Sequence, residues 1–325
     1  MSFTALLIGD ETLTSQCGEI VMARGHRIAA LVTRSAELRK WGAARGLTVL
    51  EPGAALPEAE WLLSIANLHL LKPEVLARAR NGAVNFHDGP LPERAGLNAP
   101  VWALLEGAAR HGITWHLIEG GVDEGRILEE RRFDIAPGET ALTLNTRCFE
   151  AGLESFPAVV AQLETGIRPR AQGGAPHRMH LRADRPAAFG RIDFSRPAEE
   201  VERLVRALDH GRYWNPLTTA KIDTGSRVLN VGQAEAVPGS GAPGRVLSAT
   251  PEGLVVACGS GAVRLERLSC QEKGLPVRPE SVTTPALAPL EAGAALTAAL
   301  AALAPREPAL RRALAGLSPL ALSGL

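Results

Sequence analysis

The sequence has no net charge, few cysteines and no paired-cysteine motif. Its 35 lysines and arginines balance 35 aspartates and glutamates, so no global charge attracts it to nucleic acid or to acidic membranes. The four cysteines, Cys17, Cys148, Cys258 and Cys270, are widely spaced without a CxxC pair. This spacing predicts neither a disulfide framework nor a metal site, and a reduced cytoplasmic chain is the simplest interpretation.

Targeting and membrane-spanning signals are also missing. The N-terminus turns polar within ten residues and has no basic n-region or apolar h-region, so no secretory signal is expected. The most apolar segment, 286–304, contains Pro289 and Glu291, which argues against a membrane span. No GxGxxG motif follows the first apolar run, so a dinucleotide site would lack its phosphate-binding glycines.

Strands alternate with helices in the first half of the chain. The apolar periodicity predicts strands at 3–8, 26–33, 47–50, 61–66, 83–87, 112–119 and 126–135. Helices are expected at 11–24, 35–45, 100–106 and 140–166. Such alternation predicts an α/β fold of the Rossmann-like, doubly wound type with a mostly parallel sheet.

The second half of the chain has a different pattern of predicted secondary structure. Short strands with turn signals between them are expected at 220–223, 227–231, 244–248, 254–257 and 262–268, which is typical of a small, OB-like β-barrel. We therefore predict a catalytic domain at 1–167, a basic linker at 168–190 and a barrel domain at 191–275. Leucines at helical spacing in 276–325 predict a helical tail or an inter-domain linker.

Two polar side chains stand together at the end of one predicted strand. In the run Ala83 to His87, side chains alternate, so Asn85 and His87 share one face. The following Asp-Gly-Pro-Leu-Pro cannot continue a paired strand. Asn85 and His87 are thus expected at the carboxyl end of a strand, where open α/β sheets bind ligands.

A carboxylate comes from the next predicted strand pair. The strand at 112–119 breaks at Gly120-Gly121 and places Asp123 on the loop beyond it. If the two strands are neighbours, Asn85, His87 and Asp123 meet at one rim. A carboxylate raises the proton affinity of a nearby imidazole, and an amide and an imidazolium can both donate hydrogen bonds to a developing oxyanion. That combination suits acyl transfer to an amine.

Together with the residues around them, Asn85, His87 and Asp123 form a pattern that is similar to a known family. The chain resembles the folate-dependent formyltransferases in Asn85-Phe86-His87, Leu91-Pro92, Gly96, His111 to Thr114 with His116, and Asp123 to Ile127. The resemblance implies that Asn85, His87 and Asp123 form the catalytic set and that 10-formyltetrahydrofolate is the formyl donor, with no metal. His116 and Trp115 are the candidates for contacting the acceptor substrate, and the alternative for His116 is a buried hydrogen-bonding role.

The resemblance also implies which residues bind the folate. The segment after the strand at 61–66 lines the pterin pocket of the family largely with main-chain atoms, and the loops after His87 and before Asp123 complete it. The implied folate-binding residues are Ser64, Ala66, Asn67, Leu68, Leu70, Asp88, Gly89, Pro90, Leu91, Gly121 and Val122. Gly89-Pro90 departs from the Ser-Leu usual in the family, so the backbone of that loop is expected to differ.

The acceptor amine stays open. The preferred prediction is an amino acid or a carrier-bound aminoacyl group in nonribosomal peptide biosynthesis, with a carrier protein or downstream synthetase domains as partners. The basic strip at 168–190 would contact such a carrier, or it is simply a solvated crossing between domains. A basic insertion typical of methionyl-tRNA formyltransferases is absent after Thr33, which weakens a tRNA acceptor. Alternatives are an amino sugar, methionyl-tRNA, or a catalytically silent binding scaffold.

Overall fold

The computed structural model describes residues 2–174, 177–211, 213, 215–270 and 274–290. The chain divides into two compact units, which are described separately. The first contains the chain up to Ala103, Ala108–Pro137 and Thr143–His180. The second contains Leu104–Gly107, Gly138–Leu142 and the described residues from Leu181 onward. The division at His180 falls within the predicted 168–190 linker.

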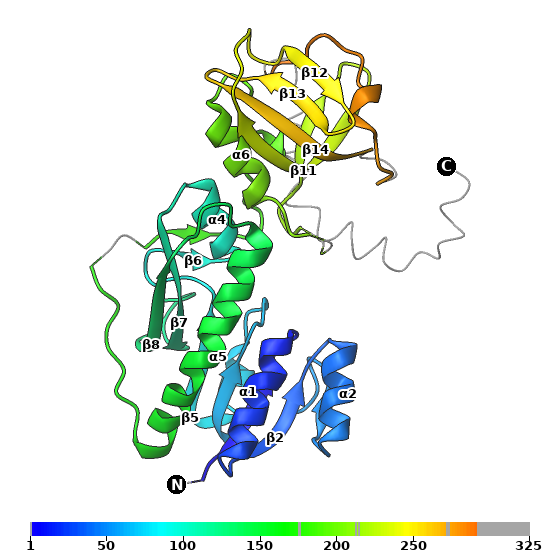
Figure 1. Ribbon diagram of the computed structural model, residues 1–325. Coiled ribbons are helices and arrows are strands. Elements are labelled where there is room, and N and C mark those ends of the chain that lie inside the picture. The colour runs from blue at the N-terminus through cyan, green and yellow to red at the C-terminus, as the bar shows by residue number, and fades with distance from the viewer. Residues whose placement is uncertain (1, 175–176, 212, 214, 271–273, 291–325) are drawn as a thin grey trace. The chain divides into compact units, whose positions relative to one another are not determined.

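The first unit is built on a seven-stranded sheet with the order β3-β2-β1-β4-β5-β7-β8. Strands β2, β5, β7 and β8 of this sheet are labelled in Figure 1. Its strands are β1 Thr4–Ile8, β2 Arg27–Val32, β3 Val49–Leu50, β4 Ala59–Ser64, β5 Ala79–His87, β7 Arg110–Leu117 and β8 Ile127–Asp134. The first five strands in this order, β3, β2, β1, β4 and β5, run parallel to one another, whereas β7 pairs antiparallel with β5 and β8 antiparallel with β7. The predicted mostly parallel sheet is thus confirmed.

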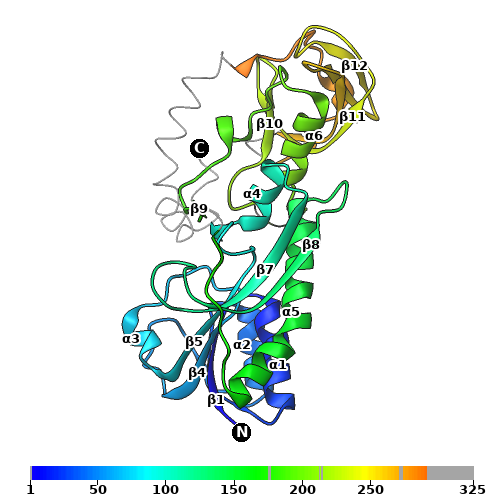
Figure 2. The same cartoon turned by 90° about the vertical axis from the view of Figure 1, so that its left-hand side faces the viewer.

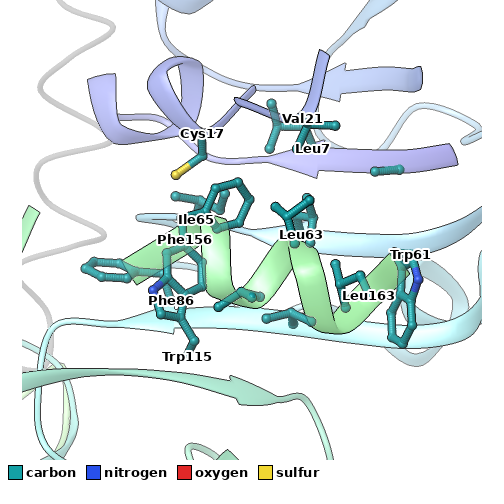
Figure 3. Close-up of a cluster of buried hydrophobic side chains, with 14 of the residues drawn as sticks. Leu7, Cys17, Val21, Trp61, Leu63, Ile65, Phe86, Trp115, Phe156 and Leu163 are labelled. Carbon is teal, nitrogen blue, oxygen red and sulfur yellow. The ribbon is translucent and has the colours of Figure 1, made fainter. Parts of the chain in front are cut away.

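Helices cover both faces of this sheet. They are α1 Thr12–Ala23, α2 Ala36–Ala44, α3 Pro73–Leu76 and α5 Ala141–Thr165. A further helix, α4 Ala99–Leu105, precedes β7. Helices α1, α2 and α5 lie on one face, as the turned view shows (Figure 2). Under them a continuous core of buried aliphatic and aromatic side chains includes Leu7, Leu63, Phe86, Trp115 and Phe156 (Figure 3). A smaller apolar cluster on the opposite face includes side chains from α3.

The second unit is a small antiparallel β domain, as predicted. Its five strands have the order β10-β11-β14-β13-β12. They are β10 Ala220–Asp223, β11 Val228–Val237, β12 Val246–Thr250, β13 Gly253–Ala257 and β14 Ala262–Cys270. Helix α6 (Ala198–Ala207) buries Val201 and Val205 in the core of this unit. Single 3-10 turns, η1 Ala187–Gly190 and η2 Pro279–Ser281, flank the strands.

Part of the predicted linker has regular structure. Met179–His180 forms β9, which pairs in parallel with β6 (Ala95–Gly96) in the first unit. The predicted tail, 276–325, lies mainly outside the described residues, which stop at residue 290. Among the residues that the structure describes, no helix is both long and apolar enough to cross a membrane.

Candidate active site

The end of β5 presents two polar side chains on one face of the sheet. Asn85 and His87 alternate with Phe86, whose ring packs into the core 5.0 Å from that of Trp115 (Figure 3). Across the sheet, Asn85 is aligned with Ser64 of β4 on one side and with His116 of β7 on the other. The predicted sharing of a face by Asn85 and His87 is therefore confirmed.

The loop that follows β5 fixes the orientation of the His87 ring. The main-chain carbonyl of Arg94 accepts a hydrogen bond from His87 Nε2 at 2.5 Å. The loop can bring the Arg94 carbonyl back to His87 only if residue 89 is a glycine, because a Cβ there would lie 2.7 Å from His87 Nε2 and 2.6 Å from the Arg94 oxygen. Since a carbonyl can only accept, Nε2 carries a proton, and Nδ1 is the nitrogen that faces the carboxylates.

Asp123 completes the cluster from the loop between β7 and β8. Its Oδ2 lies 3.6 Å from His87 Nδ1 and accepts a hydrogen bond of 2.8 Å from the Gly96 main-chain N–H. Its Oδ1 lies 3.4 Å from His116 Nε2. The predicted convergence of Asn85, His87 and Asp123 is thus present, within the first unit alone.

The route by which Asp123 arrives differs from the expectation. Because β7 is antiparallel to β5, its carboxyl end lies beside Val84 rather than at the rim where β5 ends. The loop must therefore fold back over the sheet to reach His87. Asp123 does so in the left-handed region, with φ of 56°, a conformation that Asp tolerates better than most residues.

The charge state of the cluster follows from these contacts. Burial raises the pKa of Asp123, but the positive charge of His87 and the hydrogen bonds from His116 and Gly96 more than offset it. The pKa of Asp123 is consequently well below its usual range, and the group is a carboxylate at neutral pH. Burial raises the pKa of the neighbouring Asp88, whose Oδ1 lies 3.9 Å from His87 Nδ1.

His116 links the other members of the cluster. Its Nδ1 contacts the Leu117 carbonyl at 2.8 Å, which makes Nδ1 a donor. Its Nε2 lies 3.2 Å from Asn85 Nδ2 as well as 3.4 Å from Asp123. The side chain is almost fully buried. His116 therefore contacts two of the predicted catalytic residues, whereas its predicted contact with substrate stays a prediction.

The structure places Trp115 on the opposite face of the sheet. Its side chain is fully buried, and its Nε1 donates to Ser155 Oγ at 3.0 Å beneath α5. The expectation that Trp115 contacts the acceptor does not fit this position. The physical reason is the strand alternation itself, because a residue next to His116 in β7 must face the other side of the sheet.

The predicted folate-binding residues fall into two groups. The loop 65–71 follows β4 beside Asn85, and Asn67 shapes it by donating to Ser64 Oγ and to the His69 carbonyl. On this loop Leu68 and Leu70 are 61% and 80% exposed, and Ala66 has a positive φ. Gly121 and Val122 precede Asp123, and Val122 is 37% exposed. These residues are open to a ligand.

The second group is packed inside the protein. Gly89, Pro90 and Leu91 are buried, and Leu91 packs with Ala95 and Ile127. The Leu91 N–H donates to Thr114 Oγ1, whose hydroxyl donates to the Gly89 carbonyl. These residues shape the loop beside His87, and their side chains are not open to a ligand.

Sequence reasoning missed three groups that contact the cluster. Two are the Arg94 carbonyl and the Gly96 N–H, and main-chain atoms carry no residue-type signal. The third is Gln172, from the predicted linker, whose Nε2 donates to the main-chain carbonyls of Asp123 and Gly125 at 2.7 and 2.8 Å. The only hint of it was its position in the segment after the long helix.

Comparison with known proteins places this cluster in context. A formyl transferase family model matches residues 49–160, and a model of the formyl transferase C-terminal domain matches residues 186–278. A methionyl-tRNA formyltransferase of Myxococcus xanthus is 33% identical over 208 residues, and the match spans 63% of that protein. This is less than two thirds of its length.

Two further similarities extend over a larger share of the matched proteins. A methionyl-tRNA formyltransferase of Paraburkholderia phymatum is 34% identical over 243 residues, which cover 72% of this chain and 71% of the relative. An N-formyltransferase from Helicobacter canadensis, solved with folinic acid and dTDP-3-aminofucose, has a TM-score of 0.63 at 14% identity, covering 82% of this chain and 99% of that one. The latter shows a shared fold. On the sequence identity across most of both proteins, this chain belongs to the formyl transferase family.

Proposed function

We propose that this chain transfers a formyl group from 10-formyltetrahydrofolate to a primary amine. The observation that carries the proposal is the buried pair of His87 Nδ1 and Asp123 Oδ2, 3.6 Å apart, with Asn85 on the same face of β5. Family membership supports the reaction class.

The donor binding site is proposed around the loop 65–71. Leu68, Leu70 and Val122 are the first unit's only exposed large hydrophobic side chains within the described residues, and all three belong to the loops that border the cluster. Exposed apolar side chains grouped at one site indicate binding. We propose that they pack against the flat pterin ring, while main-chain groups of 65–70 pair with its amide-like edge.

His87 and Asn85 act on the oxygen of the reacting group. The donor supplies an activated formyl carbon, whose oxygen becomes negatively charged when an amine adds. His87 Nε2 is held by the Arg94 carbonyl, so Nδ1 is the nitrogen available to donate to that oxygen. Asn85 lies on the same face of β5, with its Nδ2 3.2 Å from His116 Nε2, and an amide N–H of Asn85 donates to the same oxygen. Removing one such donor typically lowers the rate about 100-fold to 1,000-fold.

Asp123 acts on the amine. Its carboxylate lies 3.6 Å from His87 Nδ1, accepts a hydrogen bond from the attacking amine and stabilises the positive charge that develops on that nitrogen. Because its pKa lies so far below its usual range, it is a poor final proton acceptor. The amine proton therefore leaves through water to the departing nitrogen, and such transfers contribute about 100-fold to 10,000-fold.

For the acceptor, we propose an amino acid or a carrier-bound aminoacyl group, in nonribosomal peptide biosynthesis. The missing basic insertion after Thr33 supports it. An amino sugar and methionyl-tRNA are the other candidates. The named relatives are methionyl-tRNA formyltransferases, so the comparisons do not support the expectation that tRNA is a disfavoured acceptor.

The test is a direct assay of the whole chain. Purified protein is incubated with 10-formyltetrahydrofolate and panels of free amino acids, aminoacyl carriers, nucleotide amino sugars and methionyl-tRNA, and each acceptor is analysed by mass spectrometry for an added formyl group. His87→Ala serves as the blank and should remove product formation. Formylation of no acceptor, together with no binding of a stable donor analogue, would favour the binding scaffold instead.

A further inference from the structure

Gln172 contacts the main chain of the loop that holds Asp123. Its Nε2 donates to the Asp123 carbonyl at 2.7 Å and to the Gly125 carbonyl at 2.8 Å. Both partners are acceptors, so the two hydrogens of one primary amide nitrogen satisfy them together. A carboxylate of the same size could donate to neither of them. Gln172 thus fixes the backbone on both sides of Glu124.

The segment that contains Gln172 also holds a second loop of the site. We call residues 170–174 and 177–180 the strap. At one end Arg170 exchanges two main-chain hydrogen bonds with Ile127, at 2.8 and 2.9 Å. At the other end the carbonyls of Arg178 and His180 accept from Ala95 and Leu97. The strap therefore binds both the end of the Asp123 loop and strand β6.

The Asp123 loop and β6, which the strap holds, meet at the Asp123 carboxylate. Asp123 Oδ2 accepts from the Gly96 N–H at 2.8 Å, and Gly96 belongs to β6. The strap lies so close to Gly96 that a Cβ there would be 2.1 Å from the His180 carbonyl oxygen. The ring of His180 in turn stacks on that of Trp102, 4.1 Å away. The strap thus controls the positions of both the carboxylate and its main-chain donor.

The backbone of Asp123 needs such support. A φ of 56° is a sparsely populated state for a non-glycine residue, and such states persist when the surroundings hold them. The hydrogen bond from Gln172 to the Asp123 carbonyl restrains this peptide directly.

We propose that Gln172 is a positioning residue for the formyl-transfer reaction, which keeps the Asp123 carboxylate beside His87 Nδ1 and the Gly96 N–H. The expected effect of Gln172 on the rate of formyl transfer rests on the proposed function. The structural effect of Gln172, the restraint of Asp123 against Gly96, does not depend on which reaction the protein catalyses.

Two substitutions separate the loss of donors from the gain of charge. Gln172→Met keeps the length of the side chain and removes both donors, whereas Gln172→Glu also places negative oxygens against two carbonyls. We expect kcat to fall about 10-fold to 100-fold in Gln172→Met, because small displacements of a catalytic group have effects of this size. The KM for the formyl donor should change much less. The pKa of Asp123 should rise towards its usual range, since a displaced Asp123 loses hydrogen bonds that lower its pKa.

Gln162 provides the matched control. Its amide makes the same kind of clamp at the end of α5, donating to the Leu128 carbonyl at 2.9 Å and accepting from the Arg168 N–H at 3.1 Å. Among the residues that the structure describes, no hydrogen bond of its side chain involves a member of the cluster. Gln162→Met should therefore lower thermal stability while leaving kcat and the pKa of Asp123 unchanged.

Hydrogen exchange at the Gly96 amide supplies a measurement that needs no activity. The exchange should become faster in Gln172→Met and stay as in the wild type in Gln162→Met. That pattern supports the positioning role even if the chain showed no formyl transfer, which would count against the proposed function alone. Unchanged Gly96 exchange, or a kcat within about twofold of the wild type in both Gln172 variants, would overturn the inference.

Discussion

Asp123→Asn removes one negative charge from the cluster with little change in shape. Asparagine is among the residues that best tolerate a left-handed backbone, so the φ of 56° at this position can be kept. The side chain can still contact the Gly96 N–H through its amide oxygen. The variant therefore tests the charge of Asp123 rather than the folding of its loop.

The expected loss of activity follows from the distance to His87. Two unit charges 3.6 Å apart interact by about 5 kcal/mol at an effective dielectric constant of about 20. Both side chains are at least nine-tenths buried, so solvent screening is limited. The pair also exists before the reaction, and only the part of the interaction that strengthens in the transition state affects kcat. We expect kcat to fall about 100-fold to 1,000-fold.

The assay follows release of tetrahydrofolate with the acceptor identified in the panel, at saturating donor. Asp134→Asn is the control, since Asp134 lies at the end of β8 with 85% of its side chain exposed and pairs only with Arg110 among the ion pairs of the described residues. It should keep wild-type kcat. Turnover of Asp123→Asn within about threefold of the wild type would refute the electrostatic role assigned to the carboxylate.

Two further predictions concern stability. The pKa of Asp123 is lowered by folding, so its ionisation stabilises the native state above the unfolded pKa of about 4 and this stabilisation is lost as the pH falls below that value. The free energy of unfolding of the wild type, measured by denaturant titration, should therefore approach that of Asp123→Asn between about pH 4 and pH 2. A constant difference between the two proteins would contradict the lowered pKa. Trp115→Phe removes the hydrogen bond to Ser155 and should lower the free energy of unfolding by about 1–3 kcal/mol without changing either KM, whereas a raised KM for the acceptor would restore Trp115 to the substrate site.

Local sequence patterns predicted much of the fold because they depend on short-range chemistry. The alternation in Ala83 to His87 correctly placed Asn85 and His87 on one face, since successive strand residues must point to opposite sides. The same rule, applied to β7, would have placed Trp115 in the core, opposite His116. The prediction of Trp115 as a substrate contact went against this rule, and its burial beneath α5 shows why it does not fit.

The direction of β7 relative to β5 could not be predicted from such local patterns. A break at Gly120-Gly121 marks the end of a strand but does not say whether that strand runs parallel or antiparallel to its neighbour. The antiparallel pairing of β7 with β5 puts the start of the Asp123 loop beside Val84, and long-range contacts then bring the carboxylate back to His87.

The sequence by itself predicted which side chains carry the chemistry, because Asn85, His87 and Asp123 resemble the catalytic set of the folate-dependent formyltransferases in type and spacing. Only the tertiary structure decided how they are held. The groups that hold them are the Arg94 carbonyl, the Gly96 N–H and the amide of Gln172. Two of these are main-chain atoms, which every residue possesses, and the third comes from a segment far along the chain. Their roles arise from proximity in space, and a residue's identity does not encode that proximity.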